Sequence, residues 1–279
     1  MYRSVRDELI NSAVSLKLSP SFASVAEKLL TMIERDDVSL SEIADLIKCD
    51  LGMATKIISI ANSAYYSRGN PILSLNQAIL TIGLNEVKNI IVCMVFLNNI
   101  LRGTKLKEDD LIFMWTHSLF VACCARLLSK RLLIDDPEKV FTVSLFHDIG
   151  KLVFFMNIDW YRENIEEAIK KKIPLIDIES ERYGVSHTEI GSILAKKWKF
   201  PDIFGYVIKN HCITWDGYGD PSQVSLIGLI NASNTFYYFK DIPDLPYGYI
   251  LKNEHQIIEE EVEKFIELIN SRKKGDYED

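Results

Sequence analysis

The chain has 279 residues, of which 48% are hydrophobic and 25% charged, and its formal net charge is −7. This composition is typical of a folded chain with one large or two ordinary domains, and it excludes an intrinsically disordered protein. No basic run is longer than Lys170–Lys172, so the sequence does not favour a nucleic-acid-binding surface. The longest apolar run, Ile90–Leu97, is too short to cross a membrane, and no direct membrane contact is expected.

Apolar residues recur with helical spacing along the whole chain, and strand-like alternation is absent from the first half. Start signals include Ser19-Pro20 and a capping box from Ser39 to Glu42. The low content of 13 Gly and 8 Pro also favours an all-α fold. The predicted helices are 3–16, 19–34, 39–48, 50–62, 74–82, 85–101, 109–131, 136–156, 159–172, 174–183, 186–198, 202–211, 221–239 and 253–272.

A polar interruption from Arg102 to Asp110 breaks the apolar pattern and predicts a boundary between two helical lobes. We assign residues 1–105 to an N-terminal lobe and residues 106–279 to a C-terminal lobe. Residues 39–62 could also be interpreted as a DNA-binding helix-turn-helix. However, the N-terminal lobe carries eleven Lys and Arg against ten Asp and Glu, a balance that disfavours phosphate binding, so no direct DNA binding is expected.

The five cysteines are odd in number and lack the C-x-x-C spacing of a zinc site. Most lie in apolar helical contexts, which indicates reduced thiols and a cytoplasmic location. The N-terminus is amphipathic rather than a signal peptide.

Three chemically active residues interrupt the apolar stretch from Val140 to Met156: His147, Asp148 and Lys151. On a continuous helix these side chains return to one side. Burial of the charges costs several kcal/mol unless they are paired or bound to a metal. One interpretation is a structural Asp148–Lys151 pair beside a core histidine, and the other is a metal site.

Four of the five histidines lie in helical or helix-edge contexts with apolar neighbours. Separate helices could direct them, together with Asp148, at one point. Such a donor set suits iron, manganese, zinc or nickel better than magnesium or calcium. The candidate metal ligands are His117, His147, Asp148, His187 and His211, whereas His255 is predicted to be exposed.

This order of residues resembles the HD superfamily of metal-dependent phosphohydrolases. More specifically, residues 15–240 resemble HDOD-domain proteins, which are helical output modules of bacterial signalling. The resemblance implies a two-lobed all-α architecture with an HD-like C-terminal lobe. It also implies that the five candidate ligands hold a metal and that Lys151 takes the place of a lysine that holds substrate phosphate. Asp148 and Lys151 are thus the candidate catalytic residues. The segments that carry the resemblance are Leu18–Pro20, Cys49–Leu51, Ile60–Ala64, Ala78-Ile79, Ile82-Gly83, His147–Lys151, Gly184–Gly191 and Trp198–Pro201.

Two departures from the superfamily pattern bear on activity. Asn231 stands where active HD enzymes usually place a closing aspartate, so it is the sixth candidate metal ligand, although a neutral amide is a poorer ligand. The segment HCITWDGYGDP, from His211 to Pro221, resembles an eroded form of the H-H-E-x-x-D-G-x-G-Y-P loop of HD-GYP cyclic-di-GMP phosphodiesterases, with Cys212 replacing the second histidine. A plain Gly-Pro turn is the alternative interpretation of this loop.

Two functions are compatible with this pattern. The first, which the departures favour, is a regulatory signal-transduction module that binds a signalling protein or a nucleotide second messenger, with little or no catalysis and a structural metal if one is present. The alternative is a metal-dependent phosphohydrolase acting on phosphomonoesters or cyclic nucleotides.

Overall fold

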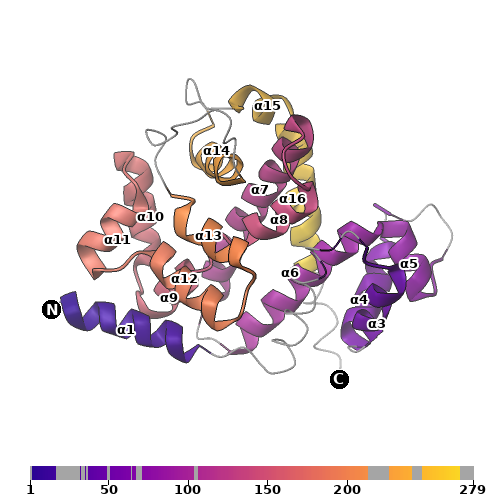
Figure 1. The fold of residues 1–279 in the computed structure, drawn as a ribbon, viewed down its shortest axis with the longest axis horizontal. Helices are drawn as coiled ribbons and strands as arrows, with labels where there is room; N and C mark the ends of the chain where they lie inside the picture. The colour runs from indigo at the N-terminus through magenta and orange to yellow at the C-terminus, as the bar shows by residue number, and fades with distance from the viewer. Residues whose placement is uncertain are drawn as a thin grey trace. The chain divides into compact units, whose positions relative to one another are not determined.

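A computed structural model describes residues 2–16, 32, 35, 37–48, 51–63, 65–66, 71–103, 106–212, 226–240 and 247–270. The elements within these ranges are helices, and no strand occurs in them (Figure 1). The all-α fold predicted from the periodicity is therefore confirmed. Most of the predicted helix 19–34 and most of the segment from His211 to Pro221 lie outside the described residues.

The chain divides into two compact units. Unit 1 comprises residues 1–18 and 103–263, and unit 2 comprises residues 19–102 and 264–279. The predicted N-terminal lobe, residues 1–105, thus does not coincide with unit 2, because the first helix belongs to unit 1.

Unit 2 contains α3 (Leu40–Lys48), α4 (Leu51–Ala61), α5 (Leu75–Ile82) and most of α6 (Leu84–Gly103). The predicted capping box is present at the start of α3, where Ser39 and Glu42 exchange hydrogen bonds. Asn62, which follows α4, donates to the carbonyl of Ile72 and accepts from its amide. The apolar face of α4 is buried in this unit, as expected of a core helix.

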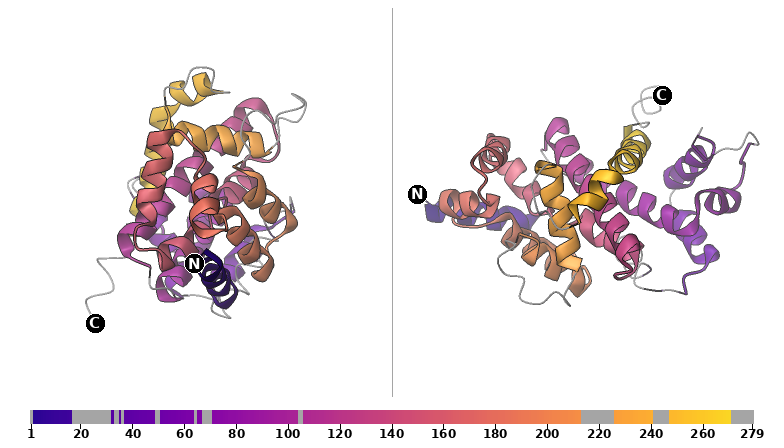
Figure 2. Two further views of the ribbon diagram at one scale, coloured as in Figure 1. Left: turned by 90° about the vertical axis from the view of Figure 1, so that its left-hand side faces the viewer. Right: turned by 90° about the horizontal axis from the view of Figure 1, so that it is seen from above.

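Unit 1 is built around α7 (Glu108–Leu132), which packs against α8 (Pro137–Leu145) and α14 (Leu226–Tyr238) (Figure 2). By length and composition α7 could cross a membrane, but 72% of its apolar window is buried inside the protein. Arg126 on α7 is largely buried, with its guanidinium carbon 4.7 Å from the ring centroid of Phe141.

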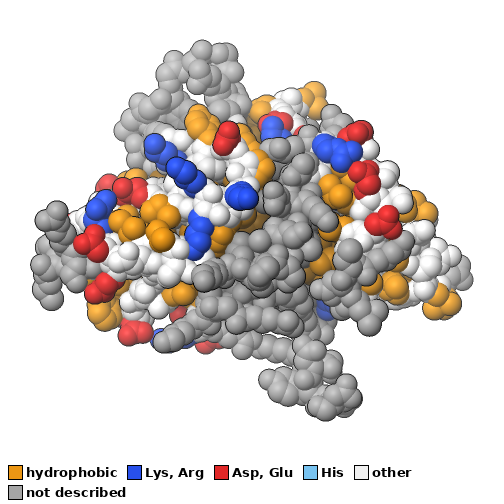
Figure 3. Space-filling model, turned by 60° about the horizontal axis from the view of Figure 1, so that its bottom comes forward, with side chains coloured by type: hydrophobic (Ala, Val, Ile, Leu, Met, Phe, Trp, Pro, Cys, Tyr) orange, Lys and Arg blue, Asp and Glu red, His pale blue; other side chains and the backbone are white. Residues whose placement is uncertain are grey.

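Unit 1 contains eight further helices or parts of helices in the described residues. They are α1 (Tyr2–Ser15), α9 (Lys151–Asn157), α10 (Tyr161–Lys171), α11 (Leu175–Tyr183), α12 (His187–Lys197), α13 (Asp202–Asn210), α15 (Gly248–Asn253) and the first part of α16 (His255–Asn270). Helix α1 packs against α9, α11 and α12. The face shown in Figure 3 carries both basic and acidic side chains.

The prediction of one continuous helix over residues 136–156 is wrong. Helix α8 ends at Leu145, a tight turn follows, and α9 begins at Lys151. The physical reason is a close approach of α12 to Gly150. A Cβ atom on Gly150 would lie 1.8 Å from the carbonyl oxygen of His187 and 2.6 Å from the amide nitrogen of Gly191. Only glycine fits at this contact, and the turn places His147 and Asp148 beside the start of α12.

Candidate metal centre

Four histidines predicted to converge do so around the carboxylate of Asp148. The oxygen Oδ2 of Asp148 lies 3.0 Å from Nε2 of His117 and 3.2 Å from Nε2 of His147. Its other oxygen, Oδ1, lies 3.3 Å from Nε2 of His187 and 3.1 Å from Nε2 of His211. Each of these five side chains is at most 3% exposed.

These side chains come from four separate parts of the chain. His117 lies in the middle of α7, and His147 and Asp148 lie in the turn between α8 and α9. His187 is the first residue of α12, directly after a capping box formed by Ser186 and Glu189. His211 is the C-cap of α13. Helix ends fixed by caps and by the Gly150 contact thus position most of the donors.

The hydrogen bonds of the Nδ1 atoms leave Nε2 of three rings as the inward-facing atom. Nδ1 of His147 lies 2.7 Å from the carbonyl oxygen of Ser144, and Nδ1 of His211 lies 3.0 Å from that of Ile208. Nδ1 of His187 lies 2.7 Å from Oε2 of the buried Glu179. A carbonyl or carboxylate accepts from a protonated Nδ1, so in the neutral ring the lone pair lies on the inward-facing Nε2, as in metal-bound histidines.

Two of the rings have buried nitrogens that no hydrogen bond satisfies. Within the described chain, neither ring nitrogen of His117 nor Nε2 of His147 makes a hydrogen bond, although both Nε2 atoms lie close to Asp148. Unpaired buried polar atoms are costly. A cation among these lone pairs would satisfy them, so the residues present fit a divalent metal.

Lys151 lies inside the cluster rather than at its edge. Its Nζ is 2.5 Å from Oδ2 of Asp148, and its side chain is 6% exposed. Burial alone would lower the pKa of Lys151, but the charge of Asp148 raises it above its ordinary value. Burial would likewise raise the pKa of Asp148, but His147 and Lys151 hold it well below its usual range. The carboxylate is therefore ionised and already paired with the ammonium.

The histidines differ in their protonation behaviour. Burial lowers the pKa of His117 to about 3 and also lowers the pKa of His147, so both are neutral near pH 7. For His211, burial opposes protonation, but the neighbouring Cys212 and Asp148 raise the pKa to about 9. The pKa of His187 is also raised against the effect of burial, chiefly by Glu179 and Cys212. The two pairs of rings thus have different electrostatic surroundings.

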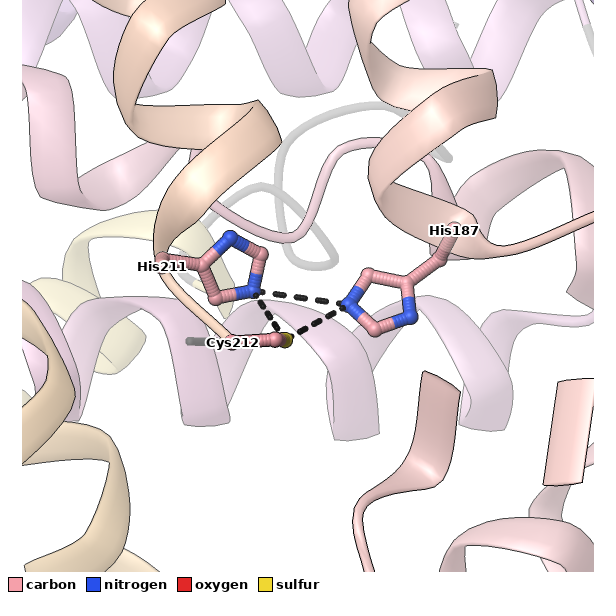
Figure 4. Close-up of side chains that lie close together, drawn as sticks. All are labelled: His187, His211 and Cys212. Carbon is pink, nitrogen blue, oxygen red and sulfur yellow. Dashed lines mark hydrogen bonds between the residues drawn. The ribbon is translucent and has the colours of Figure 1, made fainter. Parts of the chain in front are cut away.

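Sequence reasoning missed several residues of the centre. Cys212 places its Sγ 3.1 Å from Nε2 of His211 and 3.5 Å from Nε2 of His187 (Figure 4). Glu179 orients His187, and Tyr238 stacks on His117 at a centroid distance of 5.0 Å. The sequence pattern presents Cys212 only as a departure from a histidine, although a thiolate is itself a metal ligand.

The position of Asn231 in the predicted ligand set stays a prediction. The structure gives a hydrogen bond to its Oδ1 from Thr235 within α14, at 3.4 Å. The prediction that His255 is exposed is wrong. Its side chain is 23% exposed, and its ring lies 6.1 Å from the ring of Phe120 and 5.7 Å from that of Phe236. It belongs to the α7–α14–α16 packing and not to the cluster.

The fold and the buried His/Asp cluster together define a helical protein with a candidate metal centre. The HDOD domain model matches residues 19–213, and the chain belongs to this family. An HDOD domain protein from Geobacter sulfurreducens is 21% identical in sequence, with a TM-score of 0.74 over 96% of this chain and 98% of that one. A candidate phosphohydrolase from Shewanella amazonensis is 19% identical, with a TM-score of 0.65 over 92% of this chain and 98% of that one.

An uncharacterized protein of Treponema pallidum is 26% identical over 200 residues. The matched region is 69% of this chain but only 37% of that relative, so the match covers well under half of the longer protein.

Proposed function

We propose that this chain is a metal-binding regulatory module of signal transduction, with little or no hydrolytic activity. The observation that carries this proposal is the state of Lys151. In an HD-type hydrolase this lysine would face the substrate phosphate, but here its ammonium is buried and contacts Asp148 at 2.5 Å. A charge paired in this way is not available to a phosphate without a rearrangement that exposes two buried ions.

The proposed metal has a structural role, holding α7, the α8–α9 turn, α12 and α13 together through His117, His147, Asp148, His187 and His211. Iron, manganese, zinc and nickel are the candidate ions. We propose that the module acts by binding a signalling protein or a nucleotide second messenger, without direct DNA or membrane binding. The buried thiols of Cys123 and Cys124, which form no disulfide, support a cytoplasmic location.

The alternative function is a metal-dependent phosphohydrolase. It is favoured by the presence of all four histidines beside Asp148 and by the likeness in fold to the Shewanella amazonensis candidate phosphohydrolase. A bound metal would supply Lewis acidity toward a phosphate oxygen. Asp148 would hold that ion, and Lys151 would have to leave Asp148 to contact the phosphate.

Metal analysis followed by a substrate screen separates the two functions. The purified chain is assayed by elemental analysis and then with phosphomonoesters and cyclic nucleotides, with and without Mn²⁺. The proposal predicts stoichiometric metal without turnover. Turnover that is lost in Asp148→Asn but kept in His255→Gln would overturn the regulatory proposal, because His255 is the histidine outside the cluster. Absence of metal in every preparation, including those refolded with the candidate ions, would overturn the metal centre itself.

A further inference from the structure

Cys212 distinguishes one half of the centre from the other. The first half, His117 and His147, offers only imidazole nitrogens beside Oδ2 of Asp148. The second half adds a thiol to the imidazoles of His187 and His211 beside Oδ1 of the same carboxylate. The two halves therefore share Asp148 but differ in ligand chemistry.

The distances in the second half are those of a tetrahedral metal site. Bond lengths of about 2.0–2.1 Å to nitrogen or oxygen and about 2.3 Å to sulfur place tetrahedral N···N and N···O pairs about 3.3 Å apart and N···S pairs about 3.6 Å apart. The observed separation of the two Nε2 atoms is 3.4 Å, and the sulfur lies 3.1 and 3.5 Å from them. Oδ1 of Asp148 lies 3.3 and 3.1 Å from the same two nitrogens. Four of the six edges of a tetrahedron thus lie within about 0.2 Å of these lengths, and the fifth, from the sulfur to Nε2 of His211, is shorter at 3.1 Å.

The side chains around these donors are held in the orientation that binding requires. Glu179 accepts from the backbone amide of His187 at 2.8 Å and contacts its Nδ1 at 2.7 Å. The other oxygen of Glu179 accepts a hydrogen bond from the hydroxyl of Tyr161. The resulting carboxylate–histidine pair, with Glu179 fully buried, fixes the ring and increases the basicity of its Nε2. Figure 4 shows the two Nε2 atoms and the sulfur facing one another.

We propose that His187, His211 and Cys212, with Oδ1 of Asp148, form a separate subsite for a thiophilic divalent cation of the zinc or iron(II) class. This inference rests on the proposed metal centre and adds a sulfur ligand and a preference among metals to it. Because thiolate selects softer ions than carboxylate or water, this subsite favours Zn²⁺, Co²⁺ or Fe²⁺ over Mn²⁺ or Mg²⁺. The His117–His147 side, which lacks sulfur among its described donors, has no such preference.

Cobalt substitution tests the sulfur ligand directly. The metal-free chain is titrated with Co²⁺, and its absorption spectrum is compared with those of Cys212→Ser and the control Cys124→Ala. Cys124 is a buried thiol on α7, seven residues after His117 and outside the cluster. A cobalt–thiolate bond gives an intense near-ultraviolet charge-transfer band. We expect this band in the wild type and in Cys124→Ala, and its loss in Cys212→Ser, where the visible d–d bands of the remaining cobalt are retained.

A second variant guards against misfolding. Cys212→His keeps a ligand at this position, so it is expected to bind Co²⁺ without the charge-transfer band. Zinc affinity, measured by competition with a chromophoric chelator, should fall more than about tenfold in Cys212→Ser. The reason is that even the loss of a residue that only orients a metal ligand costs about tenfold or more in affinity. Manganese affinity should change less.

The outcomes separate this inference from the metal centre as a whole. Cobalt binding by the wild type without a thiolate band would overturn the Cys212 subsite and leave the proposed centre intact. A thiolate band that persists in Cys212→Ser would also overturn it. No cobalt binding at all would overturn both proposals.

Discussion

The contact between Gly150 and α12 provides a sharp test of how the centre is assembled. In Gly150→Ala the new Cβ would meet the carbonyl oxygen of His187 at 1.8 Å, where real Cβ contacts stay beyond 3.0 Å. The turn and α12 must therefore separate by more than about 1 Å, and because both partners are backbone, no side-chain rotation relieves the overlap. Overpacking of a core costs about 1–3 kcal/mol and occasionally more, and we expect the upper end of this range or beyond.

The same displacement acts on the metal donors. Moving Asp148 away from His187 by about 1 Å is large compared with metal–nitrogen bonds of about 2.0–2.1 Å, so metal affinity should fall together with stability. The assays are urea unfolding of the metal-free chain and competition titration with zinc. Gly205→Ala in α13 is the matched control, because a Cβ there meets nothing within 4 Å, and the change should stabilise the helix by about 0.5–1 kcal/mol. If the free energy of unfolding of Gly150→Ala is within about 0.5 kcal/mol of the wild-type value and the zinc affinity is unchanged, the reasoning about this contact is refuted.

Three further predictions concern the charged groups of the centre. Asp148→Asn removes the partner of the buried Lys151 ammonium, so the free energy of unfolding of the metal-free chain should fall by about 3–5 kcal/mol in urea titrations. Asp177 is exposed, and the control Asp177→Asn should change this free energy by less than about 0.5 kcal/mol. Equal effects of the two substitutions would contradict the pairing of Asp148 with Lys151. Glu179→Gln should weaken zinc binding about 10–100-fold in chelator competition, because His187 loses the carboxylate that orients its ring. Glu181 lies exposed on the same helix, and the control Glu181→Gln should leave the zinc affinity unchanged. An unchanged zinc affinity in Glu179→Gln would show that Glu179 does not position His187. Metal binding near pH 7 should release protons, because histidine ligands bind unprotonated while the pKa of His211 is raised to about 9 in the metal-free chain. Apparent zinc affinity should therefore rise with pH toward that value, and calorimetric enthalpies that do not depend on the ionisation enthalpy of the buffer would contradict this expectation.

Much of the helical pattern could be predicted because periodic burial and caps are local features. The capping box at Ser39 is a short-range signal, and α7 follows from a long apolar periodicity. The break between α8 and α9 could not be predicted in this way. It depends on the approach of α12 to Gly150, a contact between residues about 40 positions apart in the sequence, and the local apolar pattern continues through it. The six-residue helix α15 also leaves only a weak signal in the sequence, because it is short and follows Tyr247, whose backbone is in the left-handed conformation.

The candidate centre was predictable in its residue types but not in its internal organisation. Four histidines among apolar neighbours indicated a shared site, and their separate helices do bring them to Asp148. The role of Glu179 had no sequence signal, because nothing local distinguishes it from the exposed Glu181 on the same helix. Cys212 did carry a signal, since it directly follows His211. In the H-H-E-x-x-D-G-x-G-Y-P pattern this position is a histidine, so Cys212 is a mismatch to the pattern, although its sulfur lies 3.1 Å from Nε2 of His211.

Anomalous X-ray scattering from crystals grown with zinc or cobalt tests the metal centre most directly. The account predicts a peak about 2.0–2.3 Å from the Nε2 atoms of His187 and His211 and from the sulfur of Cys212, with Asp148 as a further ligand. A crystal that contains the metal but shows no anomalous peak among the four histidines and Asp148 would contradict the account.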